Sequence, residues 1–267
     1  MRQTDVVVIG GSAAGIVAAI SCRRRYPDKK VALVRKEAQV LVPCGIPYIF
    51  GTVGSPEKDL IPDALLSNNE IELIVAEAMS ISRESRSVAL KSGENISYDK
   101  LVLATGSVPV RLPIPGSDKK NVFVVSKDID YLRGVQQQVR NARDIVIVGG
   151  GFIGVEFADE CKKAGNANVN IVEILPHCLQ LALDTEFCVE AESVLTERGI
   201  RLLTGQKIES ILGGDTVTGV KLSNGDEVKA DVVIMGVGAA PNVDLARRCG
   251  LEIGPSRAIA VDSFMRT

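Results

Sequence analysis

The chain has 267 residues, of which 31 are Lys or Arg and 33 are Asp or Glu, so its formal net charge at pH 7 is −2. Hydrophobic residues make up 46% of the sequence, enough for the cores of about two domains of roughly 100–150 residues each. No basic face or charged block suggests nucleic-acid binding, and no apolar run is long enough to span a membrane.

The cysteines give the next exclusion. None of the six forms a CxxC pair, which argues against zinc and against a thioredoxin-type redox pair, and we expect no metal; they are Cys22, Cys44, Cys161, Cys178, Cys188 and Cys249. The N-terminus lacks a signal-peptide pattern, so we expect a cytoplasmic protein with free thiols.

The first half begins with DVVVIGGSAAG, Asp5 to Gly15. This pattern predicts a strand over Asp5–Ile9, a glycine-rich turn and a helix over Gly15–Tyr26, ended by Pro27 and Asp28. A strand over Val31–Val34 follows.

The rest of this half is less regular. A Pro/Gly-rich loop, VPCGIPYIFGTVG, precedes a segment over 71–90 that reads as a small antiparallel meander. A strand over Lys100–Ala104 then runs into Thr105 and Gly106. The stretch SVPVRLPIPG (107–116) holds three prolines and reads as a linker between domains.

The second half repeats this plan, starting with DIVIVGGGFIG from Asp144 to Gly154. The expected elements are strands Asp144–Val148, Asn168–Glu173 and Val232–Gly236, helices Gly154–Ala164 and Asp184–Arg198, and a hairpin over 208–231 turned by an Asn-Gly pair. The final IAVDSFMRT (259–267) reads as the start of one more strand.

The duplicated strand–turn–helix unit predicts an α/β fold with two Rossmann-like dinucleotide-binding domains. We expect domains at 1–112 and 113–242, with 243–267 beginning a return to the first. We expect a chain with two dinucleotide sites to move electrons between two dinucleotides.

The first turn departs from the full glycine pattern. Gly10 permits the tight bend and Gly15 the close approach of helix and strand, while Ser12 takes the middle glycine position. Arg35 stands where the ribose-binding acid is expected, and Glu37 is a candidate to replace that acid. The alternative is that Arg35 and Glu37 are solvated surface charges.

The second turn carries the full pattern in Gly149, Gly151 and Gly154. Glu173 occupies the acid position at the end of the next strand. A carboxylate there accepts hydrogen bonds from adenosine-ribose hydroxyls and repels a 2′-phosphate, so the second domain is expected to prefer NADH to NADPH.

Cys44 is the candidate catalytic residue. It lies between Pro43 and Gly45 in an irregular loop after the second strand, where loops of a Rossmann fold line the cofactor crevice. A thiol there is a candidate nucleophile, and packing as a small apolar side chain is the equal alternative. For the other five cysteines, the packing role is favoured.

These motifs together resemble the flavin-dependent pyridine nucleotide–disulfide oxidoreductases, in particular the single-cysteine branch of coenzyme A-disulfide reductase, NADH oxidase and NAD(P)H sulfur reductase. The resemblance covers essentially the whole chain and rests on GGSAAG, PCGIPY, YDKLVLATGSVP, GGGFIGVE and GVGAAPN. It implies a three-layer ββα form of each domain, with a β-meander crossover, FAD on the first domain and the nicotinamide cofactor on the second.

The resemblance also assigns residues. FAD binding is implied for Gly10, Gly11, Ser12, Ala13, Ala14, Gly15, Arg35, Lys36, Glu37, Pro43, Ala78, Ala104, Thr105 and Gly106. Nicotinamide-cofactor binding is implied for Gly149, Gly151, Phe152, Ile153, Gly154, Glu156, Glu173 and Gly238. Phe152 would act as an aromatic gate over the flavin, and ordinary packing at the helix start is the alternative. Arg24, beside Arg23, would bind the substrate nucleotide, and a solvated helix end is the alternative.

Family members are longer, with a flavin-binding FAxGD segment and a C-terminal dimerisation domain that this sequence lacks. We therefore expect a truncated portion of a homodimeric parent, with weak flavin binding. The expected reaction passes hydride from NADH to FAD, and then electrons to a disulfide, persulfide or polysulfide through Cys44. An oxygen-using NADH oxidase, a reductase of a protein electron carrier and an inactive nucleotide-binding fragment remain alternatives.

Overall fold

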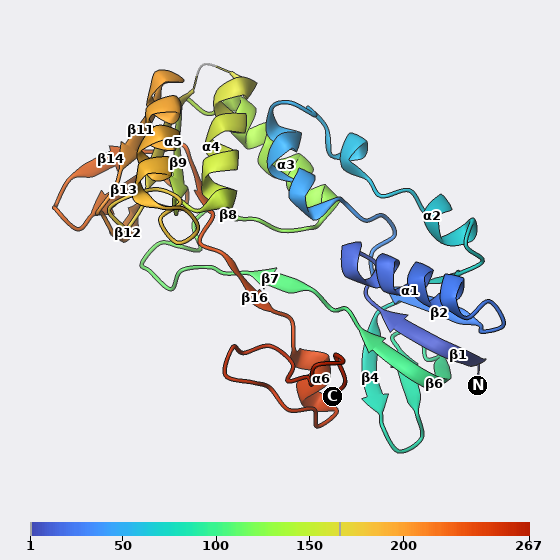
Figure 1. Ribbon diagram of the computed structural model, residues 1–267. Helices are drawn as coiled ribbons and strands as arrows, with labels where there is room; N and C mark the ends of the chain where they lie inside the picture. The colour runs from blue at the N-terminus through green and yellow to red at the C-terminus, as the bar shows by residue number, and fades with distance from the viewer. Residues whose placement is uncertain (1, 166) are drawn as a thin grey trace. The chain divides into compact units, whose positions relative to one another are not determined.

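The computed structural model describes residues 2–165 and 167–267 (Figure 1). The chain forms two compact units. Unit 1 comprises Met1–Pro43, Leu60–Val108 and Ala240–Thr267, and unit 2 comprises Cys44–Asp59 and Pro109–Ala239. Unlike the expected continuous ranges 1–112 and 113–242, this division assigns the Cys44–Asp59 segment to unit 2.

Unit 1 is built on a six-stranded sheet in the order β3-β2-β1-β6-β5-β4. Its strands are β1 (Arg2–Ile9), β2 (Val31–Arg35), β3 (Glu72–Val75), β4 (Ala78–Ser82), β5 (Ser87–Leu90) and β6 (Asn95–Leu103). Strands β3, β2, β1 and β6 are parallel, whereas β4 and β5 add an antiparallel hairpin beside β6.

Alternation along β1 gives unit 1 a core on each face of its sheet, because successive strand residues point to opposite faces. Val6 and Val8 pack with α1 (Ala13–Arg25) and α2 (Ala64–Ser67). Val7 and Ile9 pack with the β4–β5 hairpin and with α6 (Asp244–Arg248). The expected three-layer arrangement is thus present in unit 1.

Two expectations for unit 1 are wrong. The segment 71–90 is not a meander throughout, because its first strand, β3, pairs in parallel with β2 as the edge of the Rossmann sheet. Residues 259–267 form no strand; within them only Ile259 makes an isolated bridge, to Ile253, and Asp262 caps the turn that follows.

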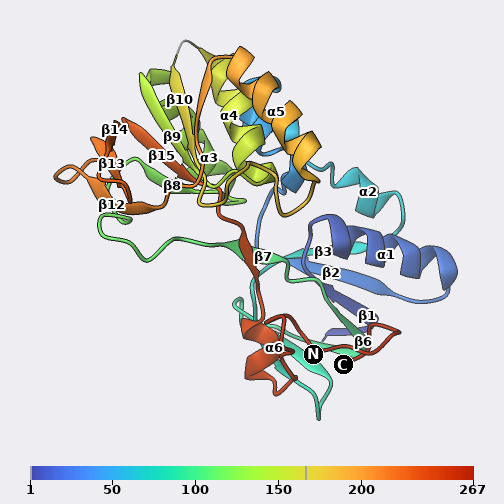
Figure 2. The same ribbon diagram turned by 60° about the vertical axis from the view of Figure 1, so that its left-hand side comes forward.

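Unit 2 contains a five-stranded parallel sheet in the order β11-β10-β9-β15-β8 (Figure 2). Its strands are β8 (Val122–Val124), β9 (Asp144–Val148), β10 (Asn168–Val172), β11 (Ile200–Leu203) and β15 (Val232–Met235). Helices α3 (Ile129–Asn141), α4 (Phe152–Ala164) and α5 (Thr185–Glu197) cover one face.

The other face of this sheet is covered by a three-stranded antiparallel sheet. It consists of β12 (Ile208–Leu212), β13 (Gly219–Leu222) and β14 (Glu227–Lys229), with Gly225 in the expected Asn-Gly turn at φ +91°. Val146 and Val148 of β9 pack with Ile211 and Val220 in the core between the two sheets.

The chain passes between the units along two short paired strands, β7 (Ser107–Pro109) and β16 (Ala239–Pro241). The segment expected to be a linker therefore includes a strand. Three short 3₁₀ turns lie between β2 and α2, over η1 (Pro43–Gly45), η2 (Pro47–Phe50) and η3 (Pro56–Asp59).

Candidate functional site: two glycine cradles and an exposed thiol

The first glycine-rich turn, between β1 and α1, leaves no room for side chains at two positions. A Cβ on Gly10 would lie 2.0 Å from the carbonyl oxygen of Ala104, and φ of Gly10 is +118°. A Cβ on Gly15 would lie 1.8 Å from the carbonyl oxygen of Gly10. The glycines therefore let the turn, the helix and the end of β6 approach one another, as a phosphate-binding turn requires.

The start of α1 offers unpaired backbone N–H groups. Its N-cap is Ser12, whose side chain makes no capping hydrogen bond, and Ala13 and Ala14 are exposed. A helix N-terminus of this kind attracts an anion such as pyrophosphate.

A cavity of about 770 Å³ in unit 1 adjoins this turn. Four of the predicted FAD residues line it: Ala14, Ala104, Thr105 and Gly106. Thr105 donates a hydrogen bond of 2.6 Å to the carbonyl oxygen of Asn242, so the β6 end is tied to the returning chain. Residues of the C-terminal segment, including Ile259 and Phe264, form another part of the wall.

Arg35 has a role that the sequence did not reveal. Its side chain is buried, and its guanidinium donates to both carboxylate oxygens of Asp63 and to the carbonyl oxygens of Glu37 and Ala38. Its stem packs so closely on the turn that a Cβ on Gly11 would lie 2.4 Å from Arg35 Cδ. Arg35 thus braces the turn rather than lying on the solvated surface.

The remaining predicted FAD residues lie around the sheet of unit 1. Lys36 is exposed and lies 3.8 Å from the carboxylate of half-buried Glu37. Ala78 begins β4 and packs against the core that holds Val7, while Pro43 begins η1. None of these four residues lines the cavity beside the glycine turn.

The glycine-rich turn of unit 2 repeats the geometry of the turn in unit 1. We call each of these turns, together with the helix start that follows it, a glycine cradle. A Cβ on Gly149 would lie 2.9 Å from the carbonyl oxygen of Gly236, and one on Gly154 would lie 1.9 Å from the carbonyl oxygen of Gly149. Gly151 is the N-cap of α4, and a Cβ there would meet nothing within 4 Å. The helix start is therefore open to a ligand while the turn below it is closely packed.

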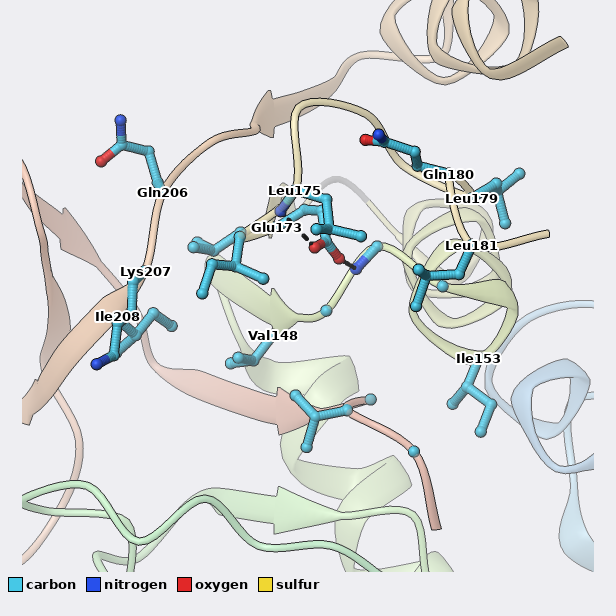
Figure 3. Close-up of a pocket in the computed structure, with 18 of the residues that line it drawn as sticks. Val148, Ile153, Glu173, Leu175, Leu179, Gln180, Leu181, Gln206, Lys207 and Ile208 are labelled. Carbon is cyan, nitrogen blue, oxygen red and sulfur yellow. Dashed lines mark hydrogen bonds between the residues drawn. The ribbon is translucent and has the colours of Figure 1, made fainter. Parts of the chain in front are cut away.

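A cavity of about 700 Å³ lies over this second cradle (Figure 3). It brings together six of the predicted nicotinamide-cofactor residues: Gly149, Gly151, Phe152, Ile153, Glu173 and Gly238. Phe152 is 58% exposed, as a movable aromatic cover requires. Gly154 is buried beneath the turn and does not line the cavity.

Glu173 ends β10 at the wall of this cavity and is 8% exposed. Its carboxylate accepts hydrogen bonds from the backbone N–H groups of Gly150 and Leu175, the latter at 2.7 Å (Figure 3). These bonds hold the acid against the turn, where its remaining lone pairs can accept ribose hydroxyls.

Sequence reasoning missed most of the residues that line the cavity. The loop after Glu173 contributes Leu179 and Leu181, and the chain before β12 contributes Gln206 and Lys207 (Figure 3). The apolar PHCLQLAL run offered a signal, because apolar residues in a loop usually cover something. Lys207 is the only Lys or Arg among the described residues that line the cavity.

Glu156 lies on α4 outside this cavity. Burial raises the pKa of the Glu156 carboxyl, and the negative charge of Glu160, one turn later, raises it further. His177 lines the cavity and lies 3.0 Å from Glu192, so the only histidine is oriented by a carboxylate of α5.

Cys44 lies in η1 and is exposed, unlike the other five cysteines. Cys161, Cys178 and Cys188 are buried, and burial raises the pKa of the Cys161 and Cys178 thiols to about 12. Cys22 and Cys249 are half-buried. The thiol singled out by sequence position is therefore also the accessible one.

Arg24 is exposed near the end of α1, with its Nε 3.4 Å from Asn69, while Arg23 forms an ion pair with Glu70. Across residues 2–165 and 167–267, no group of three His, Cys, Asp or Glu side chains is arranged to hold a metal ion. Within the same ranges, no helix has the length and apolar character needed to cross a bilayer.

Two α/β units, each with a glycine-rich turn between a parallel strand and the helix that follows it, have the form of the dinucleotide-binding Rossmann fold. The chain belongs to the pyridine nucleotide-disulphide oxidoreductase family, whose sequence profile matches residues 4–267.

Similar proteins support this membership. An NADH oxidase of Enterococcus faecalis is 30% identical over 98% of this chain and 60% of its own length. An NAD(P)H sulfur oxidoreductase (CoA-dependent) of Pyrococcus furiosus is 33% identical over 100% of this chain and 61% of its own length. The solved NAD-dependent persulfide reductase from A. fulgidus superimposes with a TM-score of 0.90 at 32% identity, covering 98% of this chain and 51% of that one. The chain thus spans about 60% of the length of the curated relatives.

Proposed function

We propose that the protein transfers electrons from NADH, held by unit 2, through FAD, held by unit 1, to a sulfur–sulfur bond that reacts with Cys44. The exposure of Cys44 in the η1 turn is the observation that carries the sulfur chemistry. The two glycine cradles carry the two cofactor assignments.

The residues present fit both cofactors. Each cradle has glycines where a Cβ would strike backbone and a helix start without a side-chain cap. In unit 1, the turn Gly10–Gly15 and the β6 end at Thr105 would hold FAD. In unit 2, the turn Gly149–Gly154 and Glu173 would hold NADH. When bound, the two cofactors supply hydride transfer and a route for an electron pair to sulfur.

The proposed preference for NADH rests on Glu173. Its carboxylate is fixed by two backbone N–H groups at the cavity wall, so it cannot swing away from a ribose 2′ position. An adenosine ribose offers two hydroxyl donors there, whereas a 2′-phosphate brings like charge against the carboxylate.

The proposed step at Cys44 is thiol–disulfide exchange. The Cys44 thiolate attacks one sulfur of a disulfide or polysulfide, forms a new S–S bond to it, and releases the other sulfur as a thiolate or shortened polysulfide. This exchange is redox-neutral. The electron pair from NADH then cleaves the mixed disulfide, returning the Cys44 thiolate and releasing the second sulfur as a thiolate.

Oxygen is the second candidate acceptor, because two relatives are named NADH oxidases. An accessible thiol such as Cys44 can also be oxidised to a sulfenic acid and reduced again, so its exposure fits both acceptors.

The deciding experiment compares the FAD-loaded chain with its Cys44→Ser variant, using NADH with coenzyme A disulfide, polysulfide or oxygen. Sulfur reduction should fall at least about a hundredfold in the variant. Reduction of ferricyanide, which needs no thiol, should persist as a control on the cofactor sites. If Cys44→Ser retained sulfur reduction, with ferricyanide activity unchanged, the thiol mechanism would be refuted. If the wild type consumed oxygen briskly without reducing the sulfur substrates, the oxidase function would be established instead.

A further inference from the structure

The segment that carries Cys44 belongs to unit 2, the proposed NADH-binding unit, where it packs on α3 and α4. Figure 1 shows this blue segment beside α3 and α4. Phe50 of η2 packs on Phe157 of α4 with ring centroids 5.1 Å apart. Ile46 and Ile49 of the same segment are also fully buried, so apolar packing contributes to this contact, and polar groups fix its register.

A buried carboxylate makes the central contact. Glu160 of α4 is 1% exposed, and its two oxygens accept hydrogen bonds from the backbone N–H of Thr52 at 2.6 Å and from the Thr52 hydroxyl at 2.9 Å. Lys163 donates to the same carboxylate at 2.7 Å. The approach is so close that a Cβ on Gly51 would lie 2.7 Å from Glu160 Oε2.

Burying a carboxylate costs folding free energy unless hydrogen-bond donors surround it. A buried acid at this point therefore indicates a specific structural role. Hydrogen bonds to Asp159 and Glu160 raise the pKa of the Lys163 ammonium, which keeps a positive charge beside the buried acid. Among the described residues, the hydrogen-bond partners of the Glu160 carboxylate outside α4 are the two donors of Thr52, in the Cys44 segment.

Helix α3 adds a second attachment to the same segment. Buried Gln136 donates from Nε2 to the carbonyl oxygens of Ile49, at 2.7 Å, and Gly54, at 3.0 Å. Arg140 donates to the Gly54 carbonyl oxygen at 2.8 Å. The backbone from 49 to 54 is therefore held by polar side chains on two helices.

We propose that Glu160 is a positioning residue for Cys44: its carboxylate fixes the Cys44–Asp59 segment on the nucleotide-binding unit and thereby sets where the thiol meets its sulfur substrate. Helix α4 then serves both sites, with its first turn at the nucleotide cavity and its third turn at the Cys44 segment. This inference rests on the proposed function of Cys44.

The test uses Glu160→Gln and Thr52→Val, with Glu190→Gln as a matched control for charge, since Glu190 is exposed on α5. In the chain without added cofactors, amide exchange in peptides covering 46–58 should be at least about tenfold faster in both test variants. Exchange in β9 and β10 and protection of Cys161, the buried neighbour of Glu160, should not change.

In the FAD-loaded chain, kcat with the sulfur substrate should fall about tenfold in the test variants while KM for NADH stays within about twofold. A residue that merely stabilised the fold would instead expose Cys161 and weaken NADH binding. Wild-type exchange over 46–58 and wild-type kcat in Glu160→Gln would overturn this inference. That failure is distinct from failure of the proposed function, which would appear as sulfur reduction retained in Cys44→Ser.

Discussion

At the scale of single residues, Glu173 has an observed structural role and a proposed role in cofactor specificity. The hydrogen bonds that it accepts from Gly150 and Leu175 fix the turn and the loop at the wall of the cavity in unit 2. The proposed ribose contact adds ligand hydroxyls to the same carboxylate. A Gln at this position keeps only one of the two acceptor oxygens, so the ratio of the affinities for NADH and NADPH, rather than the NADH affinity alone, tests cofactor choice.

We expect Glu173→Gln to weaken NADH binding about tenfold or more, since a charge-assisted hydrogen bond is worth about 1.5–3 kcal/mol. The preference for NADH over NADPH should shrink with it, because the repulsion of a 2′-phosphate disappears. Equilibrium binding of both nucleotides to the wild type and the variant measures this. Equal affinity of the wild type for NADH and NADPH would contradict the assignment.

Cys44 should be the first cysteine to react with iodoacetamide. It is exposed, whereas burial raises the pKa of Cys161 and Cys178 to about 12 and also raises the pKa of Cys22. Alkylation requires the thiolate. Mass mapping after brief alkylation identifies the order of modification, and labelling of Cys22 or Cys161 ahead of Cys44 would argue against a catalytic thiol.

Asp59 gives a prediction about pH. It is 7% exposed, its Oδ2 has no hydrogen-bond partner among the described residues, and burial raises its pKa from 3.8 to about 6. The folded state therefore holds this proton more tightly than the unfolded state. The resulting penalty is absent below about pH 4, grows as the pH rises towards about 6, and is complete above that.

Asp59→Asn removes the ionisation while keeping the shape of the side chain against Gly45. The melting temperature of the variant should exceed that of the wild type by a few degrees at about pH 7.5, and the difference should shrink at about pH 5. Thermal unfolding at both pH values tests this. A variant that melts lower than the wild type at about pH 7.5 would show that the ionised Asp59 stabilises the fold.

At the scale of elements, helix α3 depends on a single cap. Asp128 accepts a hydrogen bond of 2.7 Å from the N–H of Tyr131 at the helix start. Asp128→Ala should cost about 1 kcal/mol, or about 2–4 °C in melting temperature. Asp130→Ala is the control, because its surface pair with Arg133 contributes little. Equal losses in the two variants would contradict the capping role.

The elements that carry the cradles could be predicted because glycine spacing after an apolar strand is a local pattern. Other elements could not. Strand β3 looked like part of a meander because a short apolar run does not reveal whether its partner is parallel. The C-terminal IAVDSFMRT has strand composition, yet it is not hydrogen-bonded as a strand to the sheet of unit 1. Propensity is overridden where tertiary pairing is missing.

The residues of the candidate site also divide into those that a sequence pattern revealed and those that only the fold revealed. Glu173 and Cys44 were identified from their distance along the chain from a motif. Glu160 was not, because it looks like one of several charges in the DECKK run of a helix, and only the fold shows that it is buried against Thr52. Contacts between segments about a hundred residues apart leave no local pattern.

At the scale of the whole molecule, two units of the same plan are proposed to bind different nucleotides. Gly15 and Gly154 occupy equivalent places, each with a Cβ position less than 2 Å from the carbonyl oxygen of the turn glycine. Overpacking at either place should distort only the unit that contains it. The duplicated cradle thus allows each cofactor assignment to be tested with the other unit as its control.

The most direct measurement is equilibrium binding of FAD and of NADH to the wild type, Gly15→Ala and Gly154→Ala. The account predicts that Gly15→Ala weakens FAD binding at least about tenfold and leaves NADH binding within about twofold, while Gly154→Ala does the reverse. Loss of NADH binding in Gly15→Ala, or of FAD binding in Gly154→Ala, with the other nucleotide still bound, would contradict the assignment of the two cofactors to the two units.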